Sequence, residues 1–125
     1  MIVVDASVLI AHLDAGDLHH QDATRSLEDA ASDPFAASTI TLAEVLVGPA
    51  RAGRLEAARA ALQAMGVREI ELGADAAARL ATLRAETQLK LPDCCVILAA
   101  EEANARRLLS FDDRLLAAAE GRGLR

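Results

Sequence analysis

Four acidic residues lie far apart in the sequence but occupy similar places beside predicted strands and helices. Asp5 ends the apolar run MIVVD, Glu44 lies in the first turn of a predicted helix, Asp93 begins another helix, and Asp112 closely follows the segment RRLLS. In an open parallel sheet, the strand ends and the starts of the following helices gather along one edge, where ligands bind. We therefore expect these four carboxylates to converge on one crevice.

The chemistry expected of such a crevice is metal binding. Four like charges repel one another and raise one another's pKa values, and a fold tolerates this when a cation is shared. Carboxylate oxygens suit Mg²⁺ or Mn²⁺, whereas Zn²⁺ prefers His or Cys. The three histidines, His12, His19 and His20, lie in one early stretch away from the other acids. We expect them to be packing or solvent-facing residues.

Each acid also has a structural explanation. The segment TLAE, which ends at Glu44, fits a capping box, Asp93 directly follows a proline and suits a helix dipole, and Asp112 lies in the capping-like segment SFDD. Taken alone, Glu44 is better explained by capping, and both explanations stay open for Asp93 and Asp112. Asp5 differs, because burying a charge at the end of an apolar strand costs several kcal/mol, roughly, unless it is paired or bound to a metal. A surface-exposed strand end is the remaining alternative for it.

The elements that must position these acids alternate between strand and helix. The pattern predicts an α/β fold, a single domain in which a parallel β-sheet is sandwiched between α-helices. Strands are expected at MIVVD, PFAAS, VREIEL and RRLLS, the first in the middle of the sheet and the third, which alternates, at an edge. Helices are expected at about 7–15, 19–31, 41–47 and 55–65, and over ADAAARLATLRAETQ, DCCVILAAEEAN and DDRLLAAAE.

Local signals refine three of these helices. Ser7 is expected to cap the first helix, and Gly48-Pro49 to break the third. The segment DCCVILAAEEAN is apolar almost all round until Glu101, so we expect a central, buried helix. Its adjacent cysteines, Cys94 and Cys95, are expected to be unpaired small apolar residues in a reducing compartment.

Composition limits the function classes. The 125 residues suggest one domain, and 53% of them are hydrophobic, enough for a real core. Only 2% are aromatic, with no Trp or Tyr, which leaves few side chains to stack on nucleobases. The net charge is −6, but without the four candidate acids 15 acidic residues face 13 basic ones. The charge therefore does not exclude a nucleic-acid substrate. No signal peptide or membrane span is indicated, so a cytoplasmic protein is expected.

Three segments together resemble a known family: MIVVDASVLI, TITLAEVLVG and LKLPDCCVILAAEEANARRLLSFDDRL. They are similar to the PIN-domain ribonucleases, and in particular to the VapC-type toxins of bacterial toxin–antitoxin pairs. The resemblance covers nearly the whole chain, so residues 1–125 are expected to form one PIN domain. It matches the family's four acids in order with Asp5, Glu44, Asp93 and Asp112.

The resemblance also assigns supporting residues. Ser7 matches the small hydroxyl that supports the site, and Ser110 matches the Thr or Ser of the last motif. Asp113 doubles the last acid, which leaves open whether Asp112 or Asp113 is the fourth. Both serines would orient carboxylates.

The resemblance implies a Mg²⁺- or Mn²⁺-dependent endoribonuclease, a homodimer, and inhibition by a small antitoxin. One metal ion would lower the pKa of bound water for in-line attack on phosphorus, and a second, roughly 4 Å away, would stabilise the leaving oxygen. The products would carry a 5′-phosphate and a 3′-hydroxyl. Candidates for contact with RNA phosphates, each also explicable as ordinary solvated surface, are Arg51, Arg54, Lys90 and Arg114.

Three other functions use similar groups of residues. A receiver domain needs an acidic pair after the first strand and a Lys after the last, whereas Asp5 stands alone and Lys90, the only Lys, lies elsewhere. A haloacid-dehalogenase-type phosphatase needs Asp-x-Asp after the first strand, where this chain has Asp-Ala-Ser. The serious alternative is a catalytically silent PIN-like module that binds a partner protein.

Overall fold

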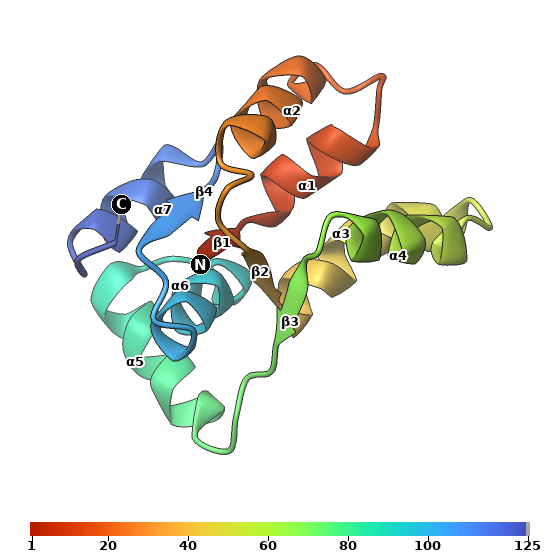
Figure 1. Ribbon diagram of the computed structural model, residues 1–125. Coiled ribbons are helices and arrows are strands. Elements are labelled where there is room, and N and C mark those ends of the chain that lie inside the picture. Colours follow the sequence, from red (N-terminus) through yellow and green to blue (C-terminus); the bar gives the residue numbers. More distant parts are fainter. Residues whose placement is uncertain (125) are drawn as a thin grey trace.

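The computed structural model of the chain describes residues 1–124. The elements follow in the order β1 (Ile2–Val4), α1 (Ala6–Leu13), α2 (His20–Asp29), β2 (Phe35–Ser38), α3 (Thr39–Arg51), α4 (Leu55–Ala64), β3 (Arg68–Ile70), α5 (Ala76–Thr87), α6 (Leu91–Glu102), β4 (Arg107–Leu109) and α7 (Asp113–Glu120). The α/β fold class predicted from the sequence is confirmed, and Figure 1 shows the short strands at the centre with helices around them.

The sheet has the strand order β3-β2-β1-β4, and every pairing in it is parallel. Ile2 pairs with Phe35 on one side and with Arg107 on the other, so β1 lies between two neighbours. The strand predicted from VREIEL is β3, and it lies at an edge. Both predictions of strand position are therefore confirmed.

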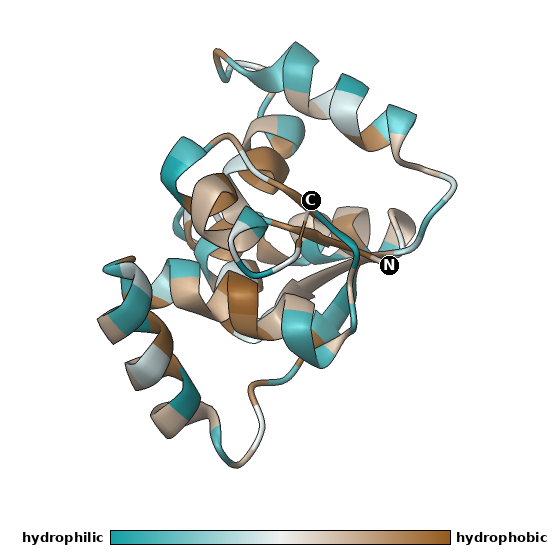
Figure 2. Ribbon diagram, turned by 90° about the vertical axis from the view of Figure 1, so that its left-hand side faces the viewer, coloured by the Kyte–Doolittle hydropathy of each residue, from teal (hydrophilic) through white to brown (hydrophobic). Residues whose placement is uncertain are grey.

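The core has two parts, one on each face of the sheet. Val3 and Ala36 face a cluster built mainly by α5, α6 and α7, whereas Ile2, Val4 and Ala37 face a second cluster formed with α1 to α4. This alternation follows from the two-residue period of a strand. Figure 2 shows the hydrophobic colour gathered in the central elements and hydrophilic stretches on the outer helices.

The helix α6 is the most deeply buried one among the described residues, since every residue from Cys94 to Ala100 is buried. Both cysteines are free and buried, as the sequence predicts. Burial raises the pKa of both thiols. Across residues 1–124, no helix is both long and apolar enough to cross a membrane.

Two helix boundaries differ from the sequence predictions. The helix α3 begins at Thr39, capped by Ser38, whose side chain accepts a hydrogen bond from the Thr41 N–H, so the capping box expected at Glu44 is wrong. The same helix continues through Pro49 to Arg51 instead of stopping before Gly48. A proline removes one N–H near the helix end, but the Ala52 N–H still bonds the Gly48 carbonyl, so the last turn holds.

Candidate active site

Asp5 lies at the end of β1 and caps α1, where its side chain is only 7% exposed. One carboxylate oxygen accepts a hydrogen bond from the Ala6 N–H at 2.8 Å. The other accepts hydrogen bonds from the hydroxyls of Ser7 and Ser110, both at 2.8 Å. Asp5 is therefore held by neutral donors, one N–H and two hydroxyls. Ser7 supports this carboxylate and does not cap the helix, so the expected cap at Ser7 is wrong.

The two serines connect the first strand to the segment that follows β4. Ser7 Oγ accepts a hydrogen bond from the Phe111 N–H at 3.2 Å, and Ser110 Oγ accepts one from the Asp112 N–H at 2.9 Å. Each hydroxyl thus donates to Asp5 and accepts from the backbone of the loop before α7. This network fixes the loop relative to the buried carboxylate.

Asp93 lies in the first turn of α6, half-buried. Burial raises the pKa of its carboxyl, and the negative charges of Asp5 and Asp112 raise it further. The positive charges of Lys90 and Arg114 act in the opposite direction. Three of the predicted acids, and two of the predicted phosphate-binding residues, therefore lie within electrostatic reach of one another.

Glu44 joins this group from the second turn of α3, because the helix begins earlier than predicted. Burial raises the pKa of its carboxyl first, and the charges of Asp5 and Asp93 raise it further. All four acids that were singled out in the sequence thus converge at the edge of the sheet where its strands end.

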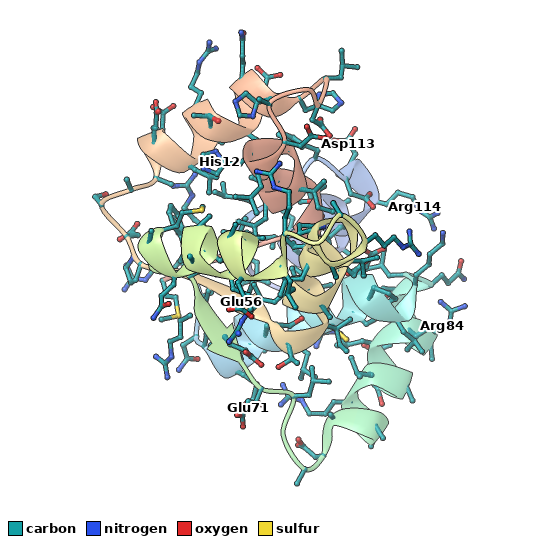
Figure 3. The ribbon with its side chains drawn as sticks, turned by 90° about the vertical axis from the view of Figure 1, so that its right-hand side faces the viewer. His12, Glu56, Glu71, Arg84, Asp113 and Arg114 are labelled. Carbon is teal, nitrogen blue, oxygen red and sulfur yellow. The ribbon has the colours of Figure 1, made fainter. Side chains whose placement is uncertain are left out.

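Asp112 has a structural function as well. It caps α7, because one oxygen accepts hydrogen bonds from the N–H groups of Arg114 and Leu115 at 2.9 and 3.2 Å. Asp113 follows in the first turn of α7 with an exposed side chain, labelled with Arg114 in Figure 3. It is the charge of Asp112 that contributes to the raised pKa of Asp93.

The donor set fits a hard divalent cation in its chemistry. It offers carboxylate oxygens, and their mutual repulsion would be relieved by a bound Mg²⁺ or Mn²⁺. In the part of the chain that the structure describes, no three His, Cys, Asp or Glu side chains are close enough together to hold a metal ion. The charges of these carboxylates nevertheless act on one another, since Asp5 raises the pKa of both Glu44 and Asp93.

The remaining predicted basic residues lie at the end of α3 and just before α4. Arg51 is the last residue of α3, and Arg54 directly precedes α4, both exposed. Arg54 lines a groove of about 550 Å³ between α1, α3 and α4. Its other lining residues include apolar side chains of all three helices and Glu44.

The groove was not predicted from the sequence. Ile10 and Val47, two of the large hydrophobic side chains that line it, are exposed. They belong to helices whose apolar residues extend beyond the face buried in the core. Apolar residues at helix positions that do not face the core are the sequence signal that could have indicated this groove.

The histidines divide into two kinds. His12 bonds Thr24 through Nδ1, and His20 bonds the Ala11 carbonyl through Nδ1, each at 2.9 Å, so both join α1 to α2. His19 instead packs against Phe111, with ring centroids 5.3 Å apart. The three histidines are therefore packing or solvent-facing residues, as expected, and the turn before α2 that carries His19 returns to the loop before α7.

The fold and the site define a member of a known class of proteins. The chain belongs to the PIN domain family, whose model matches residues 2–121. Among curated proteins, none matches the chain.

Several solved structures have similar folds. A chain of a toxin–antitoxin complex from Klebsiella pneumoniae is 29% identical, with a TM-score of 0.76 over 94% of this chain and 91% of that one. VapC20 of Mycobacterium tuberculosis, described as a sarcin–ricin loop cleaving toxin, is 23% identical, with a TM-score of 0.68 over 94% and 95%. VapBC2 of Rickettsia felis, bound to a DNA fragment from its promoter, is 20% identical, with a TM-score of 0.71 over 94% and 93%. These likenesses agree with the resemblance seen in the sequence.

Proposed function

We propose that this chain is a metal-dependent endoribonuclease and the toxin of a type II toxin–antitoxin pair. The observation that carries the proposal is the convergence of four carboxylates at one edge of the sheet around Asp5. Asp5 is buried, and within residues 1–124 its side chain is held by one N–H and two hydroxyls without an ion pair. A buried carboxylate held only by neutral donors among the described residues is suited to binding a cation.

In this proposal Asp5, Glu44, Asp93 and Asp112 hold Mg²⁺ or Mn²⁺. When bound, such an ion supplies water of lowered pKa and stabilises charge on the phosphate oxygens. We assign the fourth acid to Asp112 rather than Asp113, because its charge acts on Asp93.

The protein's own side chains perform the remaining tasks. Ser7 and Ser110 hold the Asp5 carboxylate in one orientation through their hydroxyl hydrogens. Lys90 and Arg114 lie near Asp93 and are placed to contact RNA phosphates, with Arg51 and Arg54 as more distant contacts. The positive charges of Lys90 and Arg114 would offset the repulsion between the acids and the RNA phosphates.

The toxin role rests on the likeness to toxin–antitoxin proteins and implies a small antitoxin partner. We assign this partner to the groove between α1, α3 and α4, because the groove is largely apolar, exposes Ile10 and Val47, and reaches Glu44. A peptide segment seated there would lie beside the acids and block access of RNA to them. We also propose that the protein forms a homodimer and is located in the cytoplasm.

The test of catalysis is incubation of the purified protein with structured RNA in Mn²⁺ and in EDTA. Cleavage is expected only with the metal ion, and it should be lost in Asp5→Asn and Asp112→Asn. The matched control is Asp113→Asn, which removes a neighbouring exposed carboxylate and should leave cleavage intact. Cleavage that survives Asp5→Asn would refute the four-acid site.

A second experiment tests the toxin role separately. Expression of the protein alone should arrest growth, and co-expression with the product of the neighbouring reading frame should relieve the arrest. Harmless expression of a protein that cleaves RNA in vitro would contradict the toxin role. A silent PIN-like binding module, the alternative function, would bind its partner but cleave no RNA in any metal ion.

A further inference from the structure

Two aromatic rings form an exposed pair beside the four acids. The rings of Phe111 and His19 have centroids 5.3 Å apart and planes inclined by 37°. Phe111 is 36% exposed, and His19 is exposed as well. The chain has only one other phenylalanine, Phe35, which is buried in the core at 7% exposure. One of the two phenylalanines thus keeps a face of its ring in water, where burial would stabilise the fold more.

The backbone of Phe111 is fixed relative to the site, and its ring contacts His19. The Phe111 N–H donates to Ser7 Oγ, and Ser7 in turn donates to the Asp5 carboxylate. Phe111 also lies between Ser110, which donates to Asp5, and Asp112, which caps α7. His19 is placed by its own N–H, which donates to the side chain of Asp17 at 2.8 Å. Phe111 is therefore adjacent in the sequence to Ser110 and Asp112, which both belong to this site.

We propose that the Phe111–His19 pair binds an unpaired nucleobase of a single-stranded RNA segment next to the phosphate that is cleaved. The proposal rests on the proposed ribonuclease function and adds a binding site for a base to it. Sequence-tolerant recognition of single strands uses exposed aromatic rings on which bases stack, together with positive charge for the backbone. Here Arg114 supplies that charge three residues after Phe111, near Asp93.

A structural explanation of Phe111 predicts a different outcome. Phe111 directly precedes the cap residue of α7, and Leu116 lies at the position that such a residue contacts in a hydrophobic staple. A staple needs an apolar side chain but no aromatic face. Replacement by leucine preserves a staple and removes the ring, whereas replacement by tyrosine preserves the ring.

The experiment measures binding of a fluorescently labelled short oligoadenylate by anisotropy, in Mn²⁺, with Asp93→Asn present in every protein to prevent cleavage. Adding Phe111→Leu should weaken binding about 5-fold or more, the scale of one lost base–aromatic stack. Adding Phe111→Tyr should keep the affinity within about twofold. The matched control, Leu55→Ala, removes a side chain that is 38% exposed on α4 and should leave binding unchanged.

A second probe reports stacking itself. An oligonucleotide carrying 2-aminopurine should lose fluorescence when bound by the proteins with Phe or Tyr at position 111, and should lose less with Leu. His19→Ala should reduce the quenching by a smaller amount. Equal binding and quenching by the Phe111→Leu protein would overturn the inference, as would failure of the protein with an intact ring to bind. A lower molecular mass of Phe111→Leu in sedimentation would also overturn it, by showing that the ring joins two copies of the chain.

These outcomes separate the inference from the proposed function. A protein with wild-type acids that cleaves RNA equally well with Phe or Leu at position 111 would refute the base site alone. A protein that binds oligoadenylate through the ring but never cleaves RNA in Mn²⁺ would refute the nuclease and retain the base site.

Discussion

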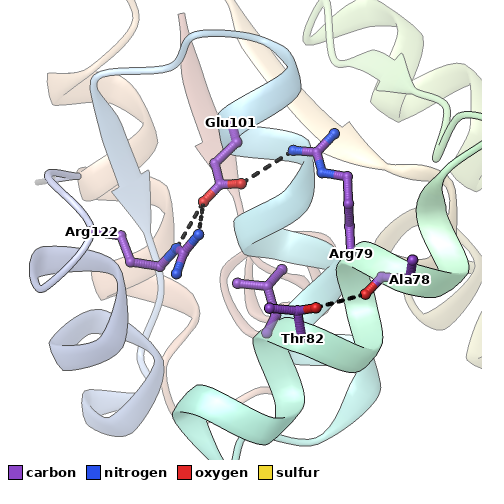
Figure 4. A pocket seen from close by; sticks show the side chains of 6 residues that line it. Ala78, Arg79, Thr82, Glu101 and Arg122 are labelled. Atoms are coloured by element: carbon purple, nitrogen blue, oxygen red, sulfur yellow. Dashed lines mark hydrogen bonds and ion pairs between the residues drawn. The ribbon is translucent and has the colours of Figure 1, made fainter.

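The buried helix α6 carries carboxylates at both ends, and the two sets of carboxylates have different charged neighbours. At its C-terminal end, Arg79 binds both Glu101 and Glu102, and Arg122 binds Glu101 at 2.7 Å and Glu86 at 3.2 Å. Figure 4 shows Glu101 between the two arginines, beside a pocket of about 220 Å³. At its N-terminal end, Asp93 meets other acids, and among the described residues neither Asp93 nor its three acidic neighbours form an ion pair.

Helix electrostatics make this difference informative. Negative charge is unfavourable at a helix C-terminus, so Glu101 and Glu102 need the arginines that α5 and the C-terminal turn provide. Asp93 lies at the favourable end, and its pKa is nevertheless raised, because burial and the charges of Asp5 and Asp112 outweigh the benefit. The C-terminal end of α6 is thus the balanced end, where arginines pair with the acidic side chains. The N-terminal end is the unbalanced end, where negative charge is in excess, as is common at functional sites.

The largest expected effect is on activity at the unbalanced end. Asp93→Asn removes one charge and keeps the shape, so RNA cleavage should fall by more than about 100-fold, because a proposed metal ligand is lost. The metal-free protein should be as stable as wild type, or more stable by up to about 1 kcal/mol, because repulsion is relieved. A ribonuclease assay in Mn²⁺ and denaturant midpoints in EDTA measure the two effects. Cleavage at a near wild-type rate would remove Asp93 from the mechanism.

Metal ions should stabilise the protein through the unbalanced end only. An ion that binds the folded state alone adds about 2.7 kcal/mol when its concentration is a hundredfold above the Kd. Thermal melting with millimolar Mn²⁺ should therefore show a higher midpoint for wild type and Glu101→Gln, and a much smaller rise for Asp5→Asn. A rise that Asp5→Asn leaves intact would place the ion elsewhere.

The balanced end should respond in stability and not in activity. Glu101→Gln weakens the contacts with Arg79 and Arg122 and should cost about 1 kcal/mol, since these side chains are partly solvated. RNA cleavage should be unchanged. The control is Glu56→Gln, whose pair with Arg59 is fully on the surface and should contribute close to nothing. A loss of cleavage in Glu101→Gln would end the distinction between the two ends.

The smallest expected effect is a pH dependence of stability in EDTA. The pKa of Asp93 is raised in the folded protein, so the folded state holds this proton more tightly than the unfolded chain does. Its destabilisation is absent below the ordinary carboxyl pKa and is complete above the raised value. The stability of Asp93→Asn relative to wild type should therefore grow as pH rises through that window. The expected difference is on the order of a few tenths of a kcal/mol, because water still reaches the side chain. A stability difference that shrinks with rising pH would contradict this prediction.

Much of this arrangement could be predicted from the sequence because it depends on local patterns. The apolar run before Asp5 and the apolar stretch after Asp93 can be satisfied only by a central strand and a buried helix, and the structure contains both. Parallel strands then bring their ends to one edge, so the meeting of the acids follows from topology. Their role in metal binding and catalysis stays a prediction.

The features that escaped prediction depend on contacts between distant segments. Asp5 caps α1 in place of Ser7, because the Ser7 hydroxyl binds Asp5 and receives the Phe111 N–H from the other end of the chain. The contact of His19 with Phe111 and the groove beside Glu44 also arise only after helices have packed. Local propensity carries no information on such pairs.

The bond between Ser110 and Asp5 joins residues 105 positions apart, and this separation has a consequence for synthesis. The ribosome makes Asp5 early, but the hydroxyl that holds it, and the β4 strand that flanks β1, come only after more than a hundred further residues. At ordinary rates of translation this delay is roughly 5–20 s. A chain still being elongated thus carries an acid without its support, and the complete site can assemble only once Ser110 and Asp112 have left the ribosomal tunnel.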